Sequence, residues 1–256
     1  MIKEESRFTD STVFEGMTSI RAVLDNLKNG ISNARKINKI LYDKTKSKSK
    51  CKEIAYLKKM GELYSFQVEP TDTEVIASLS VGNSHGGIIA LCDERIYPEI
   101  SLSSIKECGF YAMIEGIEDP YNFGYALRSI YASGVDGIIL SERNWLSAAG
   151  VVCRSSAGAS ERAEIFIANN DFIDMFKQKN YKIVCADIKN STSIYDADLK
   201  KPIFLIVGGE KRGISSFILS KADEIVRIDY GRPFDAALSA ASASTIIAFE
   251  IYKQNR

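Results

Sequence analysis

The sequence predicts an α/β protein whose C-terminal part carries a doubly wound parallel sheet. From residue 105 to residue 256, short apolar runs rich in Val and Ile alternate with amphipathic stretches, as in parallel sheets that helices cover on both faces. The chain has 256 residues and is 45% hydrophobic, which is enough for two modest domains. Three short segments, residues 122–128, 208–213 and 237–243, fall where a predicted strand leads into a loop or helix, which is where open α/β sheets collect their ligand-binding groups.

Each element of residues 105–256 is predicted by its own pattern. Apolar β-branched runs predict strands, and apolar side chains at helical spacing predict helices. The strands are expected at residues 110–114, 137–140, 164–168, 182–186, 203–207 and 224–228. The helices are expected at residues 123–132, 147–154 and 171–178, from residue 215, and at residues 237–253.

The first part of the chain is predicted to form a smaller α/β domain. Asn29-Gly30 stops one helical pattern, and Pro70-Thr-Asp starts another. The helices are expected at residues 16–29, 51–60 and 71–79, and the strands at residues 39–42, 64–68 and 87–92. Residues 97–104 have the pattern of a linker. The predicted domains are therefore residues 1–98 and residues 105–256.

A basic segment lies inside the first predicted domain. The chain is neutral overall, with 33 basic and 33 acidic residues, so its net charge indicates no polyanionic partner. Residues 28–59, in contrast, hold eleven Lys or Arg and two acidic residues, and residues 44–52 alternate lysine with small residues. Such a run can place several cations against phosphates, or it can be a solvated surface loop. The neutrality elsewhere favours contact with RNA or DNA.

Cysteine and histidine usage excludes several kinds of site. The five cysteines are scattered and form no CxxC pair, so we expect neither a disulfide framework nor a structural zinc site. His85 is the only histidine, which excludes a multi-histidine metal centre, and we expect no metal. No apolar run approaches the ~20 residues that span a bilayer, and the first residues lack an apolar signal segment. These features predict a cytoplasmic protein without membrane contact.

The cluster Gly208-Gly-Glu-Lys-Arg-Gly213 follows the strand expected at residues 203–207. A phosphate-binding P-loop needs Lys just before its final Ser or Thr, and Ile214 occupies that position. No G-x-G-x-x-G sequence follows a strand, so a dinucleotide site is also disfavoured. The paired glycines allow a ligand to approach the backbone closely. The alternative is a tight turn with a solvated Glu210.

Together with two other clusters, this loop resembles the signature motifs of the SpoU (TrmH-type) family of RNA ribose 2′-O-methyltransferases. The first motif, Asn-x-Gly-x-x-x-Arg, is matched by Asn122, Gly124 and Arg128. The second, Gly-x-Glu-x-x-Gly, is matched by residues 208–213. The resemblance extends over the whole predicted C-terminal domain.

The third motif is matched in part. The family usually has Ser-Leu-Asn-(Val/Ala)-Ser-x-Ala, and residues 237–243 read Ala-Leu-Ser-Ala-Ala-Ser-Ala. Ala237, Ser239 and Ala241 thus stand where the family usually has Ser, Asn and Ser. A subfamily could use Ser239 with Ser242, or the site could have lost activity and kept RNA binding.

The resemblance implies a C-terminal domain with a deep trefoil knot and S-adenosylmethionine bound in its crevice. Six residues are assigned to the cofactor by this resemblance: Ala186, Gly208, Gly209, Gly213, Ile228 and Leu238. Four are assigned to the active site: Asn122, Arg128, Glu210 and Ser239. Because a guanidinium with a pKa above ~12 is a poor base, we expect Arg128 to clamp a phosphate and orient the ribose. Glu210 is expected to hold Arg128 or Asn122 by hydrogen bonding.

The first domain is similar to the accessory RNA-binding domain of one branch of this family, which resembles ribosomal proteins that bind kinked RNA. Glu15-Gly16 and the segment from His85 to Ala90 are the matching landmarks. The residues expected to contact RNA are Arg35, Lys36, Lys44, Lys46, Lys48, Lys50, Lys52 and His85. The resemblance implies ribosomal RNA as the preferred substrate, transfer RNA as the second choice, and a homodimer through the C-terminal domain. The rival is a catalytically inactive RNA-binding or ribosome-assembly protein on the same fold.

Overall fold

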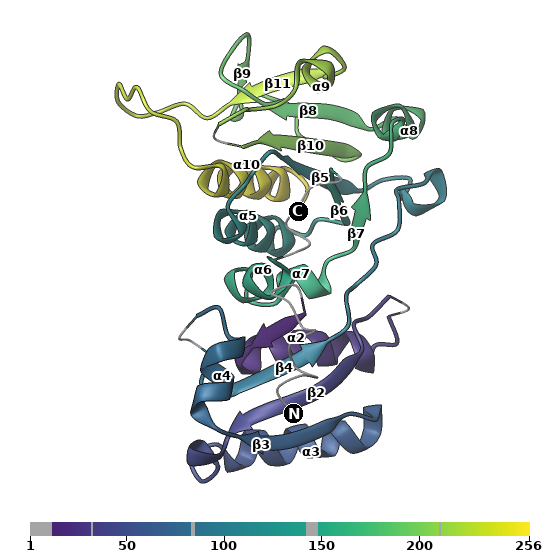
Figure 1. Ribbon diagram of the computed structural model, residues 1–256. Helices are drawn as coiled ribbons and strands as arrows, with labels where there is room; N and C mark the ends of the chain where they lie inside the picture. The colour runs from purple at the N-terminus through teal and green to yellow at the C-terminus, as the bar shows by residue number, and fades with distance from the viewer. Residues whose placement is uncertain (1–11, 32, 83–84, 142–147, 210) are drawn as a thin grey trace. The chain divides into compact units, whose positions relative to one another are not determined.

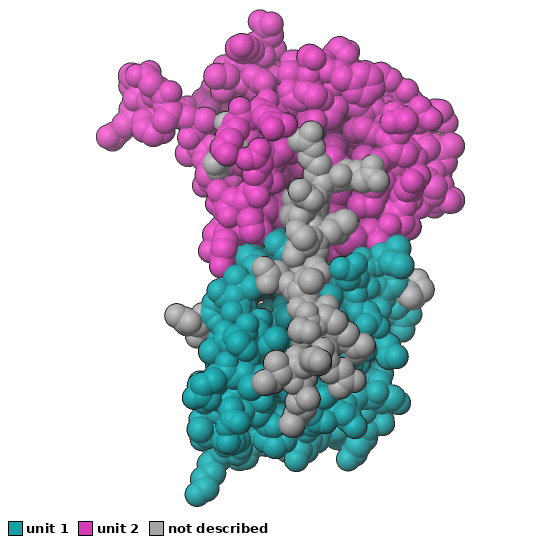
Figure 2. Space-filling model, in the orientation of Figure 1, with its two compact units in different colours: residues 1–96, 144–162 teal, residues 97–143, 163–256 magenta. Residues whose placement is uncertain are grey.

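The chain forms two compact units. The computed structural model describes residues 12–31, 33–82, 85–141, 148–209 and 211–256. Figure 1 follows the chain through its helices and strands. Figure 2 colours the first unit, residues 1–96 with 144–162, separately from the second unit, residues 97–143 with 163–256. Within the described ranges, no helix is long and apolar enough to cross a membrane.

A four-stranded sheet with the order β1-β4-β2-β3 forms the centre of the first unit. β4 (Ile88–Cys92) pairs antiparallel with β1 (Val13–Glu15) and with β2 (Ile37–Asp43). β2 pairs parallel with β3 (Gln67–Thr71). The sheet therefore ends at β3, and an edge strand tolerates the proline that this strand contains.

The helices of this sheet follow the predicted spacing, with one difference in length. α2 (Gly16–Lys28) buries Ile20, Val23 and Leu24, the apolar face that its sequence predicts. The short helix η1 (Lys44–Lys46) and α4 (Thr73–Leu79) flank α3 (Cys51–Tyr64) along the chain. α3 was expected to end at residue 60, but it continues to Tyr64, and Ser65 then turns the chain in the left-handed region with φ 60°. The following strand is therefore shifted from residues 64–68 to β3.

Two short helices from the middle of the chain belong to the first unit. α6 (Ala149–Ser155) and α7 (Ala159–Arg162) pack against α2, and Ala149 and Cys153 join the core of this unit. The division into units thus differs from the contiguous domains 1–98 and 105–256, because α2 buries apolar surface that these helices cover. The small-residue stretch 155–160 ends α6 and connects it to α7.

The second unit is built on the predicted parallel sheet. Its seven strands have the order β7-β6-β5-β10-β8-β11-β9, and every ladder between neighbouring strands is parallel. The strands are β5 (Phe110–Glu115), β6 (Gly137–Leu140), β7 (Ile165–Ile167), β8 (Lys182–Ala186), β9 (Thr192–Ser193), β10 (Ile203–Gly208) and β11 (Glu224–Arg227). β9 gives no signal in the sequence, because two residues are too short to show an alternating pattern. The α/β class with a parallel sheet is confirmed.

Helices cover both faces of this sheet. α5 (Pro120–Ala132) and α10 (Ala240–Gln254) lie side by side (Figure 1), and a hydrogen bond of 2.7 Å joins Thr245 Oγ1 to Ser129 Oγ. α8 (Phe172–Gln178) and α9 (Ser216–Ser220) contribute to a core with alternate residues of β10. In that core the ring of Phe176 stacks on Phe204 with centroids 4.1 Å apart. The short helix η2 (Leu102–Ser104) precedes β5.

The burial of the cysteines gives a test of both cores. Cys92, Cys153 and Cys185 are buried, whereas Cys51 and Cys108 are exposed. Burial raises the pKa of Cys153 and of Cys185 to about 12, and the thiolate is the reactive form. We therefore expect iodoacetamide at pH 8 to label Cys51 and Cys108 in the native protein, as read by peptide mass spectrometry. Equal labelling of Cys153 or Cys185 without denaturant would contradict the fold.

Candidate active site

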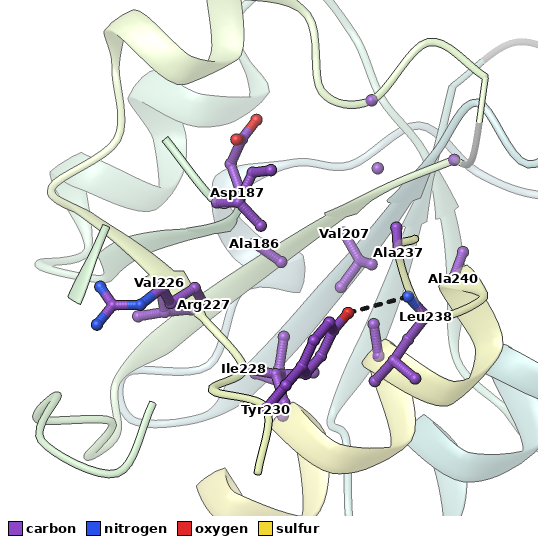
Figure 3. A pocket seen from close by; sticks show the side chains of 16 residues that line it. Ala186, Asp187, Val207, Val226, Arg227, Ile228, Tyr230, Ala237, Leu238 and Ala240 are labelled. Atoms are coloured by element: carbon purple, nitrogen blue, oxygen red, sulfur yellow. Dashed lines mark hydrogen bonds between the residues drawn. The ribbon is translucent and has the colours of Figure 1, made fainter. Parts of the chain in front are cut away.

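A cavity of about 220 Å³ opens at the carboxyl ends of β8, β10 and β11 and the start of α10. Figure 3 shows its walls, which are mostly aliphatic. The lining residues are Ala186, Asp187, Ile188, Val207, Gly208, Gly209, Gly213, Val226, Arg227, Ile228, Tyr230, Ala237, Leu238, Ala240, Ala243 and Ile247. All six residues assigned to the cofactor from the sequence lie in this one set.

The sheet register explains why these distant segments meet. Ala186, the last residue of β8, pairs with Val207 on one side and with Val226 on the other, so the three strands end within one residue of the same level. Parallel strands that end level bring their following loops to the same edge of the sheet. The loops that begin at residues 187, 209 and 228 therefore share this edge, and the cavity lies among them.

The glycine loop after β10 is closed tightly on the end of β5. The Gly209 N–H donates to the Glu115 carbonyl at 2.6 Å, and the Gly213 N–H donates to the Gly209 carbonyl at 2.9 Å. A Cβ at Gly208 would lie 2.5 Å from the Gly213 carbonyl carbon, and one at Gly209 would lie 2.1 Å from the Gly116 oxygen. Gly213 itself has φ +62°, which favours glycine. The loop thus requires glycine at all three places.

Substituting Gly209 by alanine tests this close approach. The new methyl group would meet backbone atoms that cannot turn away, so we expect a loss of about 1–3 kcal/mol in the free energy of unfolding. Gly231→Ala is the matched control, because a Cβ at Gly231 meets nothing within 4 Å. Thermal and urea unfolding of both variants measure the difference. Equal stability of the two variants would mean that the loop is looser than described.

The third segment forms the start of α10. Ser239 is the N-cap, and its hydroxyl oxygen accepts a hydrogen bond from the Ser242 N–H at 3.2 Å. The hydroxyl groups of Ser239 and Ser242 lie 3.0 Å apart. Behind this cap, the small side chains of Ala240 and Ala243 leave the cavity open. Ser239 is not among the lining residues, and its hydroxyl is engaged in capping the helix.

The first motif lies on α5, outside the cavity lining. Asp119 caps this helix by accepting the backbone N–H of Asn122 at 3.0 Å. The side chain of Arg128 is exposed. Among the residues that the structure describes, it makes neither an ion pair nor a hydrogen bond. Glu210 lies outside the described residues. The guanidinium of Arg128 is therefore available to bind an anion, and it lies on the helix that packs beside α10.

Two polar side chains at the cavity were missed by motif analysis. Arg227 lines the cavity, and its Nε donates to Asp229 Oδ1 at 2.8 Å. A hydrogen bond from Ser193 and the one from Arg227 lower the pKa of Asp229. Asp187 also lines the cavity and accepts a hydrogen bond from the Lys189 N–H at 3.0 Å. Asp187 directly follows β8 and Arg227 ends β11. These positions at the ends of predicted strands were the signal in the sequence that could have identified both residues.

Most of the predicted RNA contacts of the first unit follow the end of β2, whereas Lys36 precedes its start. Lys44 forms an ion pair with Asp72, and Lys50 forms one with Glu53. Lys36, Lys48 and Lys52 are exposed, and Lys46 is half-buried. A Cβ built on Gly87 would lie 2.7 Å from the Lys46 side chain. The Asp43 N–H also donates a hydrogen bond to the Gly87 carbonyl at 2.8 Å. The loop that contains His85 and the lysine segment are therefore neighbours.

Arg35, which was expected to contact RNA, is buried. Its side chain is 2% exposed, and its Nε lies 3.1 Å from both carboxylate oxygens of Glu161. Its Nη1 donates to the Asp93 carbonyl at 3.2 Å, and the guanidinium lies 4.8 Å from the centre of the Phe14 ring. A guanidinium enclosed in this way holds β1, α7 and the end of β4 together. The Arg35 side chain is therefore too buried to contact RNA.

Comparison with known proteins identifies the fold and the family. The family model described as the SpoU rRNA Methylase family matches residues 109–249, which is more than half of the chain. The chain belongs to this family. The residues matched by the family model include the cavity and all three motifs.

Individual relatives of the SpoU methylase cover nearly its whole length. A Staphylococcus saprophyticus protein assigned to the TrmH family of tRNA/rRNA methyltransferases is 26% identical over 235 residues, which are 89% of this chain and 92% of the relative. An AdoMet-bound rRNA methyltransferase from Sinorhizobium meliloti has a TM-score of 0.76 at 23% identity and covers 94% of this chain and 87% of its own. The AdoMet complex of AviRb from Streptomyces viridochromogenes has a TM-score of 0.71 at 17% identity, covering 94% and 89%. At these identities the structural likeness establishes the fold.

Proposed function

We propose that this protein transfers a methyl group from S-adenosylmethionine to a ribose 2′-hydroxyl of RNA, with ribosomal RNA as the first candidate and transfer RNA as the second. One observation carries the proposal: the six residues assigned to the cofactor from the sequence line a single cavity. The two solved relatives named above contain AdoMet, and the family model is that of an rRNA methylase. The protein would act in the cytoplasm, where such RNA is found.

The residues of the cavity fit this cofactor. Aliphatic walls at Val207, Ile228 and Leu238 suit the adenine base, and the glycine loop lets backbone groups reach the ligand. When bound, S-adenosylmethionine supplies an electrophilic methyl carbon on a sulfonium. We expect the main-chain groups at Gly208, Ile228 and Leu238 to hold and orient it.

The remaining task of the protein is positioning. The ribose oxygen would form a bond to the methyl carbon as the carbon–sulfur bond breaks, with the electron pair left on the sulfur of S-adenosylhomocysteine and the hydroxyl proton released to water. In-line displacement requires the oxygen and the methyl carbon in near-attack geometry. We infer that Arg128 clamps a phosphate of the target nucleotide, because its guanidinium is exposed and makes no ion pair within the described residues. Asn122 and Ser239 would orient the substrate around it, and Glu210 would hold Arg128 or Asn122.

The chain order at the cavity supports a trefoil knot in the second unit. β8 lies between β10 and β11 in the sheet, although it precedes both in sequence. The connection from β11 to α10 then passes the cavity beside the loops that follow β8 and β10. We propose that this last connection is threaded through those loops, as the resemblance to the family implies.

We propose that the first unit supplies general affinity for RNA. Its lysine segment begins next to the His85 loop, and Lys36, Lys48 and Lys52 are exposed. Exposed cations suit a phosphate backbone, and their contribution should fall steeply with salt. Accessory units of this kind can hold the RNA while the second unit modifies it.

A homodimer through the second unit is the proposed assembly. α5 and α10 carry exposed aromatic side chains, with Tyr121 39%, Tyr125 50%, Phe249 43% and Tyr252 49% exposed. The rings of Phe249 and Tyr252 lie 6.3 Å apart. Exposed aromatic side chains on two adjacent helices are typical of protein interfaces. Arg128 lies on the same helix, so dimer formation would place it near a second copy.

Single-turnover transfer of labelled methyl groups tests the function. Purified protein should label ribosomal RNA or transfer RNA, and nuclease digestion followed by mass spectrometry should locate the label on a ribose 2′-oxygen. The departures at Ala237, Ser239 and Ala241 favour the rival, a catalytically inactive RNA-binding protein. RNA binding without any methyl transfer to either RNA would support that rival.

A further inference from the structure

A hydrogen bond at the cavity joins the two ends of the connection between β11 and α10. Ile228 and Tyr230 line the cavity from one end of this connection, and Ala237 and Leu238 line it from the other. Between them the chain reaches out beyond the sheet (Figure 1). The Leu238 N–H donates to the hydroxyl oxygen of Tyr230 at 3.1 Å, as the dashed line in Figure 3 shows. This bond joins the two ends of the connection.

The helix does not use the Leu238 amide. The N-cap is the next residue, Ser239, whose hydroxyl accepts the Ser242 N–H and whose carbonyl accepts the Ala243 N–H at 2.9 Å. The capping interactions therefore begin after Leu238. Its N–H is a main-chain donor at the cavity, and a tyrosine side chain satisfies it.

Adenine offers the same kind of partner as the tyrosine hydroxyl. The ring nitrogens of adenine accept hydrogen bonds, and its flat face packs well against an aromatic ring. Aliphatic side chains flank the Leu238 amide, among them Val207 and Ile228. The bond from the Leu238 N–H to Tyr230 is exposed to solvent. An adenine nitrogen must therefore replace the tyrosine hydroxyl to accept this N–H, because one N–H makes one strong hydrogen bond.

The Tyr230 side chain has space to move. Its side chain is 40% exposed, and its ring meets Phe234 edge to face at a centroid distance of 6.0 Å. Phe234 is itself 60% exposed. Breaking the bond to Leu238 would therefore leave the Tyr230 hydroxyl in contact with water, at no cost in buried polar groups.

We propose that Tyr230 is a cofactor-contacting residue: its hydroxyl accepts the Leu238 N–H, adenine takes over that N–H when it binds, and the Tyr230 ring packs on the base. This inference rests on the proposed function, because it takes S-adenosylmethionine as the ligand. It assigns two separate effects to one side chain. The hydroxyl competes with the ligand, and the ring stabilises the complex.

Calorimetric titration with S-adenosylhomocysteine separates these two effects. Tyr230→Phe removes the competing bond and keeps the ring, so we expect about 2- to 10-fold tighter binding. Tyr230→Ala also removes the ring, and we expect about 5-fold weaker binding than that of Tyr230→Phe. Tyr195→Phe is the control, because Tyr195 is 59% exposed and lies outside the cavity lining. Thermal unfolding establishes that each variant is folded.

The outcomes distinguish this inference from the function on which it rests. Unchanged or weaker binding by Tyr230→Phe would overturn the role of Tyr230 while wild-type binding upheld the cofactor. No binding by the wild type would overturn both. Hydrogen exchange adds a second measurement: in Tyr230→Phe the Leu238 amide should exchange quickly without ligand and slowly with it. Fast exchange in the complex would contradict the proposed contact with adenine.

Discussion

Replacing Arg128 by alanine should lower the rate of methyl transfer to RNA by about 100-fold or more, with S-adenosylmethionine binding unchanged. Arg128 lies on α5 outside the cavity lining, so its removal leaves the cofactor walls intact. A bidentate bond from a guanidinium to a phosphate is strong and directional, and its loss disturbs the near-attack geometry. A 100-fold decrease corresponds to about 2.7 kcal/mol of transition-state stabilisation. Single-turnover kinetics at saturating RNA measure this rate.

Two further variants sharpen the experiment on Arg128. Arg128→Lys keeps the charge but loses the planar fork, so we expect it to recover only part of the rate. Arg256→Ala removes an exposed arginine at the far end of α10 and should leave the rate unchanged. Wild-type transfer by Arg128→Ala would remove Arg128 from the mechanism. Equal loss in Arg256→Ala would show a general effect of charge on RNA binding.

Replacing Arg35 by alanine should destabilise the first unit by about 3–5 kcal/mol. The substitution leaves the carboxylate of Glu161, which is 1% exposed, without its partner in the interior. An uncompensated buried charge is among the most destabilising changes that a single substitution makes. Thermal unfolding followed by circular dichroism should show a midpoint lowered by roughly 10 °C.

The residue next to Arg35 provides a matched control. Lys36 is exposed, so Lys36→Ala should change the free energy of unfolding by less than about 0.5 kcal/mol. Arg35→Met combined with Glu161→Leu removes both charges and should restore part of the lost stability. If Arg35→Ala were as stable as Lys36→Ala, the buried ion pair would not hold α7 to this unit.

The parts of the site that sequence predicted are those fixed by chain geometry. Apolar runs located β8, β10 and β11, and loops that follow parallel strands meet at one edge of a sheet. The resemblance to the family assigned Gly208 and Leu238 to the same site, and this shared edge explains why they meet although 30 residues separate them in the sequence. Steric requirements explain the glycines themselves, since the loop leaves no room for a Cβ at Gly208 or Gly209.

The parts that sequence could not predict depend on contacts between distant residues. Arg35 and Lys36 are adjacent cations, and only the tertiary position of Glu161 decides that one is buried. The docking of α6 and α7 against α2 has no periodic signal, because each helix is too short to show one. Tyr230 stands outside the motifs, and its bond to Leu238 depends on how the connection after β11 returns to the cavity.

Calorimetric titration with S-adenosylmethionine, carried out on the wild type and on Ala243→Phe, tests most directly whether the cavity is the cofactor site. Ala243 lines the cavity, so a phenyl group there should fill it, whereas Ala236→Phe at an exposed position outside the lining is the control. We predict one bound molecule per chain for the wild type and for Ala236→Phe, and no binding for a folded Ala243→Phe. Absence of binding to the wild type, or equal binding to Ala243→Phe, would contradict the assignment of this cavity.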